Sequence, residues 1–241
     1  MLSRWAFIAV ISLIVFLITE SCGPSRFVVP LRRGDHAVSA SFGGPVIEIP
    51  EVGNRPIPMS SITYGHGISD NLTAYGSLFT TAAIFGTIQL DAGVTRRLWM
   101  NPKGNTGITV SPGLNFAMDI FEFNTKLWPQ LDFNYYWKYS KHYRAQEDFL
   151  TSKVFTHNFI YAGLGSWFEL SRTKAHEQDQ EVRMLPIIQL GHDLTWKRWI
   201  LKTEVKLIGF NHRNENIVVD YKSVFGDFGA TGVYIGITRR F

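Results

Sequence analysis

Residues 126–138, KLWPQLDFNYYWK, alternate between apolar and polar side chains along most of their length. Because successive side chains of a β-strand point to opposite faces of a sheet, this period of two predicts a strand with one apolar and one polar face. The apolar set contains Leu127, Leu131, Phe133, Tyr135 and Trp137, and the polar set contains Gln130, Asp132, Asn134 and Lys138.

The same alternation recurs along the chain in stretches of about ten residues, separated by Gly, Asn, Asp and Pro. Between these stretches we expect a Pro-rich loop at 48–58, tight turns at 69–71 and 196–198, and a charged, solvated loop at 169–182. The connection at 139–153 is long, which leaves eight or twelve strands as alternatives. The preferred count is ten, with strands at 37–47, 59–68, 72–79, 87–98, 107–118, 126–138, 155–168, 184–195, 199–208 and 230–241.

A soluble β-sandwich and a membrane barrel both alternate, but they differ in what each face meets. In a membrane barrel the apolar set meets lipid, while the polar set fills the lumen, where opposite charges neutralise one another. The sheet must close, because an open sheet in hydrocarbon leaves backbone groups unpaired. We therefore predict an all-β fold, a transmembrane antiparallel up-and-down barrel of about ten strands whose lumen is largely filled by its own side chains. The predicted polar network of the lumen consists of Gln89, Asp91, Gln130, Asp132, Asn134, Asp193, Lys202, Glu204, Lys206 and Arg240.

Aromatic residues and loop lengths agree with a membrane barrel. The connections on the side of the two termini are mostly short, and those on the other side include the long loops, as this architecture requires. Trp side chains near strand ends are placed as an interfacial girdle would be, at Trp99, Trp137, Trp196 and Trp199.

The N-terminal region has the features of a secretory signal peptide. Arg4 precedes an apolar run from Trp5 to Thr19, which suits a signal core better than a membrane helix of about twenty residues. Cys22, the only cysteine, follows directly, and its position resembles a lipobox, which implies lipidation of Cys22. The alternative is a lone structural thiol. We assign 1–21 to the signal peptide, 22–36 to an anchor and linker, and 37–241 to the barrel.

The last strand, GVYIGITRRF at 232–241, completes a resemblance to bacterial outer-membrane β-barrel proteins. The resemblance implies a location in the outer membrane and contact with its lipid and lipopolysaccharide. The terminal Phe241, with Ile237 and Ile235 at alternate positions, is similar to the signal read by the barrel-assembly machinery, although Arg239 interrupts the alternation. A membrane-protein partner is also expected.

Composition gives little support for other classes of function. The net charge of +4 comes from scattered basic pairs, which is weak evidence for nucleic-acid binding, and we expect none. No pair of His residues has metal-binding spacing on a helix, so we expect no metal and no cofactor. An acidic edge in a loop, where a calcium ion could bridge to lipopolysaccharide, is better interpreted as solvated; it contains Glu177, Asp179 and Glu181.

Catalysis would need a histidine beside an acid or a nucleophile. His66 and His192 fall on the apolar register of their strands, and His157 begins a strand. The candidates for a hydrolase acting on lipid or peptide are therefore His176, His212 and Asp220 in the outer loops. The preferred interpretation is a barrel with a structural, binding or scaffold role and no catalytic residue. A narrow pore or small-solute transporter and an outer-membrane hydrolase are the alternatives.

Overall fold

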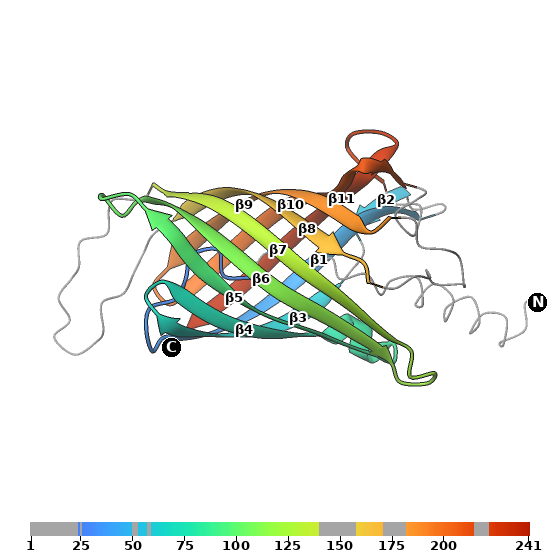
Figure 1. Cartoon of the computed structure of the whole chain (residues 1–241), viewed down its shortest axis with the longest axis horizontal. Helices are drawn as coiled ribbons and strands as arrows, with labels where there is room; N and C mark the ends of the chain where they lie inside the picture. Colours follow the sequence, from blue (N-terminus) through green and yellow to red (C-terminus); the bar gives the residue numbers. More distant parts are fainter. Residues whose placement is uncertain are drawn as a thin grey trace, which may run out of the picture.

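The computed structural model describes residues 24, 26–49, 53–56, 59–139, 158–170, 182–214 and 222–241. These residues form strands almost throughout (Figure 1). Among them, no helix is long and apolar enough to cross a membrane. The elements are β1 (His36–Ile49), β2 (Gly53–Pro56), β3 (Ser60–Ser69), β4 (Leu72–Phe79), α2 (Thr80–Ile84), β5 (Thr87–Met100), β6 (Thr106–Asp119), β7 (Thr125–Lys138), β8 (Phe159–Phe168), β9 (Met184–Trp196), β10 (Trp199–Arg213) and β11 (Phe228–Arg240).

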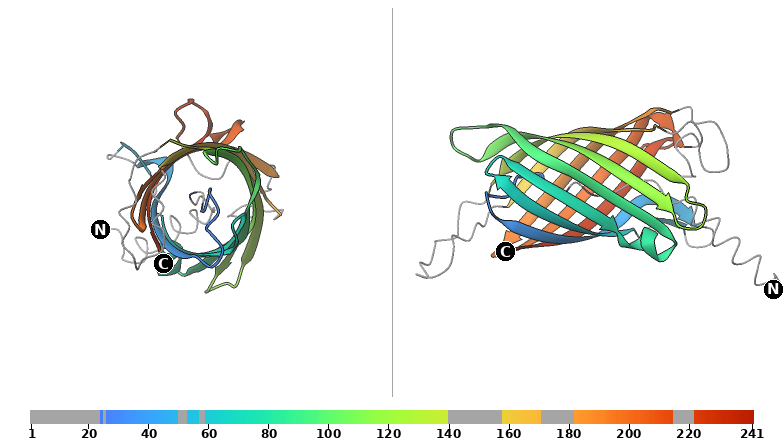
Figure 2. Two further views of the ribbon diagram at one scale, coloured as in Figure 1. Left: turned by 90° about the vertical axis from the view of Figure 1, so that its left-hand side faces the viewer. Right: turned by 60° about the horizontal axis from the view of Figure 1, so that its bottom comes forward.

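Ten of these strands close into an antiparallel barrel. Each pairs with its sequence neighbours from β3 to β11, and β1 pairs with both β3 and β11. The closing register runs from Ala37 opposite Arg240 to Pro45 opposite Gly232, and the end-on view of Figure 2 shows the resulting ring. The predicted fold and the predicted count of ten strands are confirmed, although the connection between β7 and β8 is long.

The structure corrects two details of the predicted strands. The Pro-rich segment 48–58 is not wholly a loop, because β1 runs on beyond the ring and its end, Val46–Ile49, pairs with β2. Prolines are compatible with this hairpin because β2 is an edge strand. Strand β10 continues to Arg213 instead of ending at Ile208. Its alternation breaks there because the register shifts at a bulge, beside Gly209 with φ +61°.

The two ends of the barrel differ. The turn end carries the start of β1, the end of β11 and the short turns after β3 and β9. The loop end carries β2 and α2, and an apolar cluster lies inside the ring there. It joins Phe79 to Trp167 on the opposite wall, together with Met59, Val182, Leu185, Ile187, Ile208, Ala230 and Tyr234. The lumen is therefore polar only in part, because apolar side chains fill it at the loop end.

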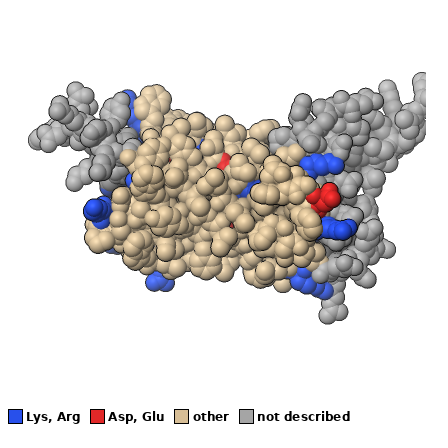
Figure 3. All heavy atoms as spheres, turned by 90° about the horizontal axis from the view of Figure 1, so that it is seen from above, with Lys and Arg blue, Asp and Glu red and all other residues tan. Residues whose placement is uncertain are grey.

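The outer wall is apolar over its whole height between the ends. Leu164 on β8 and Leu190 on β9 are 62% and 61% exposed. In Figure 3 the charged side chains of the described residues gather at the two ends and leave a wide belt almost free of charge. The four Trp side chains predicted to form a girdle, Trp99, Trp137, Trp196 and Trp199, are exposed near the turn end. A closed barrel with such a belt is a transmembrane barrel of the type found in bacterial outer membranes.

Candidate functional site

A segment preceding the first strand lies inside the barrel. Residues 26–34, which we call the plug, run from the middle of the lumen, where Arg26 contacts Asp91, to the turn end, and the end-on view of Figure 2 shows this segment within the circle of strands. Phe27, Val28 and Leu31 are buried, with 7%, 2% and 2% of their surface exposed. The sequence analysis placed these residues in an anchor and linker at 22–36 and gave no indication that they enter the lumen.

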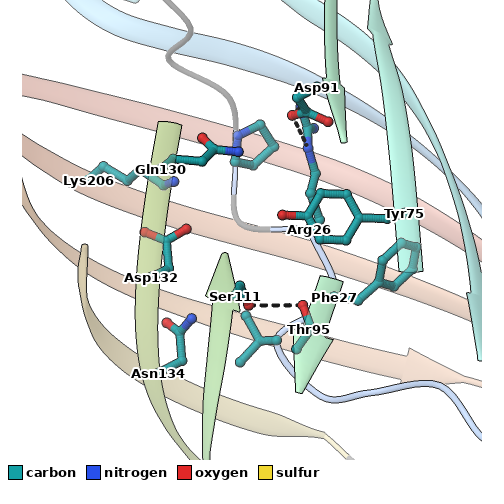
Figure 4. Close-up of a pocket in the computed structure, with 12 residues that line it drawn as sticks. Arg26, Phe27, Tyr75, Asp91, Thr95, Ser111, Gln130, Asp132, Asn134 and Lys206 are labelled. Atoms are coloured by element: carbon teal, nitrogen blue, oxygen red, sulfur yellow. Dashed lines mark hydrogen bonds and ion pairs between the residues drawn. The ribbon is translucent and has the colours of Figure 1, made fainter. Parts of the chain in front are cut away.

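The plug is fixed by an ion pair with the barrel wall. Arg26 donates hydrogen bonds from Nε and Nη2 to Asp91 Oδ2 on β5, at 3.0 and 2.5 Å, and from Nη1 to Ser61 Oγ on β3, at 3.0 Å. Both side chains of the pair are 5% exposed. Figure 4 shows the guanidinium group facing Asp91. Because charges withdrawn from water need a partner, this pair fixes the position of the plug across the lumen.

Further contacts hold the plug along its length. The Leu31 backbone N–H donates to Thr73 Oγ1 at 2.7 Å, and Lys202 Nζ donates to the carbonyl oxygen of Arg26. The ring of Phe27 lies 6.4 Å from that of Tyr75. Val28 packs in a cluster with lumen-facing aromatic residues of β7 and β8, which are Tyr136, Phe159 and Tyr161.

Strand β3 is shaped to the plug by two glycines. A Cβ atom added at Gly65 would lie 2.3 Å from the ring of Phe27, and one added at Gly67 would lie 1.8 Å from the carbonyl oxygen of Arg32. Neither position can carry a side chain while the plug keeps this path. Plug and wall therefore fit each other at the level of the backbone.

Two further ion pairs join lumen charges within the wall. Lys206 Nζ lies 3.6 Å from Glu204 Oε1, and Lys202 Nζ lies 3.9 Å from Asp193 Oδ2. The hydroxyl of Tyr161 donates to Glu204 Oε2 at 2.5 Å. These contacts join residues of β8, β9 and β10 inside the barrel, where a buried charge is costly without a partner.

All the residues of the predicted polar network have inward positions on their strands. Gln189 Nε2 donates to Asn134 Oδ1 at 2.7 Å, so amides also pair inside the ring. The buried members are Gln89, Asp91, Asn134, Asp193, Lys202, Glu204 and Lys206; Gln130 and Asp132 line a pocket beside the plug, and Arg240 lies at the turn end.

Little space remains around the plug. The pockets beside Arg26 and Phe27 have volumes of about 20 and 10 Å³, which is about the size of one water molecule. A cavity of about 720 Å³ lies at the turn end, where the plug meets the rim. Over the part of the chain that the structure describes, the centre of the lumen is filled.

The candidates for catalysis and metal binding are not assembled in the described part of the chain. His212 Nε2 lies 3.3 Å from the carbonyl oxygen of Met184, and its suggested partners His176 and Asp220 lie outside the described residues. The acidic edge at 177–181 and His157 also lie outside them. Within the described ranges, no group of three or more potential ligands could hold a metal ion.

Several other predicted residues lie on the outer wall. His66 stacks on His36 with ring centroids 4.6 Å apart, and His192 contacts the hydroxyl of Tyr139 at 2.6 Å. Cys22, with the signal peptide at 1–21, lies outside the described residues. The three residues proposed as the assembly signal face outward or lie at the rim, with Ile235 50%, Ile237 48% and Phe241 57% exposed.

Comparison with known proteins assigns neither a family nor an activity to this chain. The sequence matches no family model, and no curated protein is detectably similar to it. Solved structures with a similar fold include a bacterial polysaccharide outer membrane secretin, at 9% identity and a TM-score of 0.42, covering 88% of this chain and 99% of that chain. The NanC porin has 9% identity and a TM-score of 0.39, covering 84% and 98%. The N-terminal barrel domain of Pseudomonas aeruginosa OprF has 9% identity and a TM-score of 0.33, covering 88% and 100%. Similarities at this level give no basis for transferring an activity.

Proposed function

We propose that this chain is an outer-membrane barrel closed by its own N-terminal segment, with a binding or scaffold role instead of open conduction. The observation that carries the proposal is the plug, which Arg26 ties to Asp91 in the middle of the lumen. The apolar cluster at the loop end supports it, because Phe79 and Trp167 from opposite walls belong to one buried apolar cluster inside the ring. Solutes would have to pass both barriers.

The orientation belongs to the same proposal. In barrels of this type the short turns face the periplasm and the longer loops face outward. The turn end, with its cavity, would then face the periplasm, and the loop end would face the exterior. Partners of a scaffold would meet one of these two ends, because the belt between them is occupied by lipid.

The finer assignments from the sequence remain part of this proposal. They are a signal peptide at 1–21, lipidation of Cys22, and assembly through the terminal strand. A catalytic role is not included, because His212 is the described member of the suggested hydrolase site and it contacts a backbone carbonyl. A narrow pore would require the plug to leave the lumen.

Thiol labelling and conductance test the closed state directly. With Cys22 replaced by Ser the chain has no thiol, so Val28→Cys places a single probe at a position that is 2% exposed in the plug. A membrane-impermeant maleimide should label it slowly in the folded barrel and fully in urea. Arg33→Cys, at an exposed plug position, is the matched control and should be labelled at once.

In planar bilayers the wild-type protein should give no stable conductance steps under conditions in which an open porin conducts. Labelling of Val28→Cys as fast as Arg33→Cys in the folded protein would overturn the plug. Regular conductance steps from the wild type would overturn the closed barrel and support the pore instead.

A further inference from the structure

The cavity at the turn end, which we call the vestibule, is built jointly by the plug and the barrel wall. Its volume is about 720 Å³, within the range of small-molecule sites. The plug contributes Arg32 and Arg33 from one side, and strands β5, β7 and β11 contribute cations from the other. The complete set of cationic lining residues is Arg32, Arg33, Arg97, Lys138 and Arg240.

The vestibule contains more positive than negative charge. Its lining carboxylates are Asp35 and Asp70, so five cations face two anions. Partial burial lowers the pKa of Arg32, and the nearby carboxylates of Asp35 and Asp70 oppose that shift. Asp70 also accepts a hydrogen bond from the Arg33 backbone N–H at 3.1 Å.

The wall cations retain unused hydrogen-bonding capacity. The Nε atoms of Arg97 and Arg240 are buried and have no hydrogen-bond partner among the described residues. Lys138 experiences the positive charges of both of these arginines and of Arg32. Buried donors are costly without acceptors, and like charges repel, so an anion in the vestibule would stabilise this arrangement.

We propose that the vestibule binds a small soluble organic phosphate. Arginine forks match phosphate oxygens in bidentate geometry, and a phosphate monoester dianion would offset most of the excess positive charge. A volume of about 720 Å³ leaves room for an organic group beside the phosphate. The vestibule lies within the ring of strands, so a lipid could reach it only by withdrawing its acyl chains from the hydrocarbon. This argument favours a soluble ligand over a lipid headgroup.

The ligand would bridge two parts of the molecule. Arg33 belongs to the plug, whereas Arg97 and Arg240 belong to the wall. An anion that contacts both sides binds the plugged state better than a state with the plug withdrawn, so its binding stabilises the plug. The inference therefore uses the plug position described above, but it adds a ligand that the closed barrel itself does not require.

The test is calorimetric titration of the folded barrel in a zwitterionic detergent at low ionic strength, with glucose 6-phosphate as the probe and glucose as its uncharged match. The double variant Arg97→Gln/Arg240→Gln should lose about tenfold or more in affinity, because each arginine supplies charge-assisted hydrogen bonds. The matched control is Arg96→Gln/Arg239→Gln, which removes the same charge from the neighbouring, outward-facing residues. Its affinity should stay within about twofold of the wild type, since only long-range, salt-screened charge is lost.

A second variant guards against misfolding of the double variant. Arg33→Gln changes an exposed plug residue and should also weaken binding several-fold. Heat-dependent electrophoretic migration confirms that each variant is folded.

The proposal is overturned if glucose binds as well as glucose 6-phosphate, or if both arginine pairs weaken binding equally. An unchanged affinity in Arg33→Gln overturns the site shared with the plug, and binding that appears only with phosphatidylglycerol micelles overturns the soluble ligand. In each case the labelling of Val28→Cys still reports separately on the plug.

Discussion

Replacing Arg26 by Met should destabilise the folded barrel strongly. Methionine keeps most of the aliphatic volume beside Phe79 but removes the charge that faces Asp91. The carboxylate is 5% exposed and would then remain buried without a counter-charge. Breaking a buried pair in this way costs about 3–5 kcal/mol of unfolding free energy.

Withdrawal of the plug would cost more free energy than leaving Asp91 unpaired. If the plug left the lumen, Asp91 would regain water, but Phe27, Val28 and Leu31 would lose their burial. Each of these side chains contributes about 1.5–3 kcal/mol. Their sum, about 4.5–9 kcal/mol, exceeds the cost of the stranded carboxylate, about 3–5 kcal/mol, over most of its range, so we expect the plug to stay in Arg26→Met and the cost to appear as lost stability.

The double variant Arg26→Met/Asp91→Asn separates charge from packing. Removing both charges leaves no uncompensated ion, so its loss should be smaller than the sum of the two single losses by about 2 kcal/mol or more. The assay is urea unfolding in detergent micelles, followed by the fluorescence of the Trp residues of the barrel. A loss below about 0.5 kcal/mol in Arg26→Met, typical of an exposed pair, would refute the reasoning, as would additive losses in the double variant.

Two further predictions use the same urea assay. Gly191→Ala should lower the free energy of unfolding by about 1–3 kcal/mol, because the added Cβ would lie 2.2 Å from the ring of Tyr161 and overpack the lumen. The control is Gly76→Ala, which should leave stability unchanged because the nearest neighbour of its added Cβ is 3.7 Å away. Equal effects of the two variants would contradict the tight fit of the lumen. Leu190→Arg, at the centre of the lipid-facing belt, should lower the free energy of unfolding by about 2–4 kcal/mol. Met184→Arg, on the same face at the loop end of β9, should lower it by at most about 1 kcal/mol. Equal losses at these two depths in the membrane would contradict the position assigned to the belt.

The strands could be predicted because their signal is local. Alternation places β4 at 72–79 in both sequence and structure, and it places β7 to within one residue. The errors occur where the strand pairing continues although the alternation of the side chains does not. At Ile208 the alternation breaks at a bulge although β10 continues, and around Pro50 the composition indicates a loop although the backbone on both sides pairs in a hairpin. Closure itself was predictable, since lipid does not tolerate an open sheet edge.

The plug could not be predicted from periodicity. Residues 26–34, RFVVPLRRG, have no regular alternation, and Pro30 interrupts any ladder. The partners are distant in sequence, because Arg26 binds Asp91 65 residues later and Lys202 176 residues later. One trace of the plug was present in β3, where Gly65 and Gly67 leave the lumen face without side chains. Glycine in a strand indicates close approach of another backbone, but it does not identify which segment approaches.

The balance of charge in the lumen was the other sequence feature that could have indicated the plug. It can be examined at the centre of the barrel and in the vestibule at the turn end. The lumen residues predicted from sequence carry four carboxylates and three cations, and one of those cations, Arg240, lies at the turn end. Lys202 and Lys206 lie beside Asp193 and Glu204, which leaves Asp91 and Asp132 without an ion pair to a described cation of the wall. The chain itself supplies the missing charge for Asp91 through Arg26. The vestibule has the opposite imbalance, and no described residue supplies the missing anions. The physical cost that places an arginine beside Asp91 also favours an anion at the turn end, and the organic phosphate proposed for the vestibule would supply it.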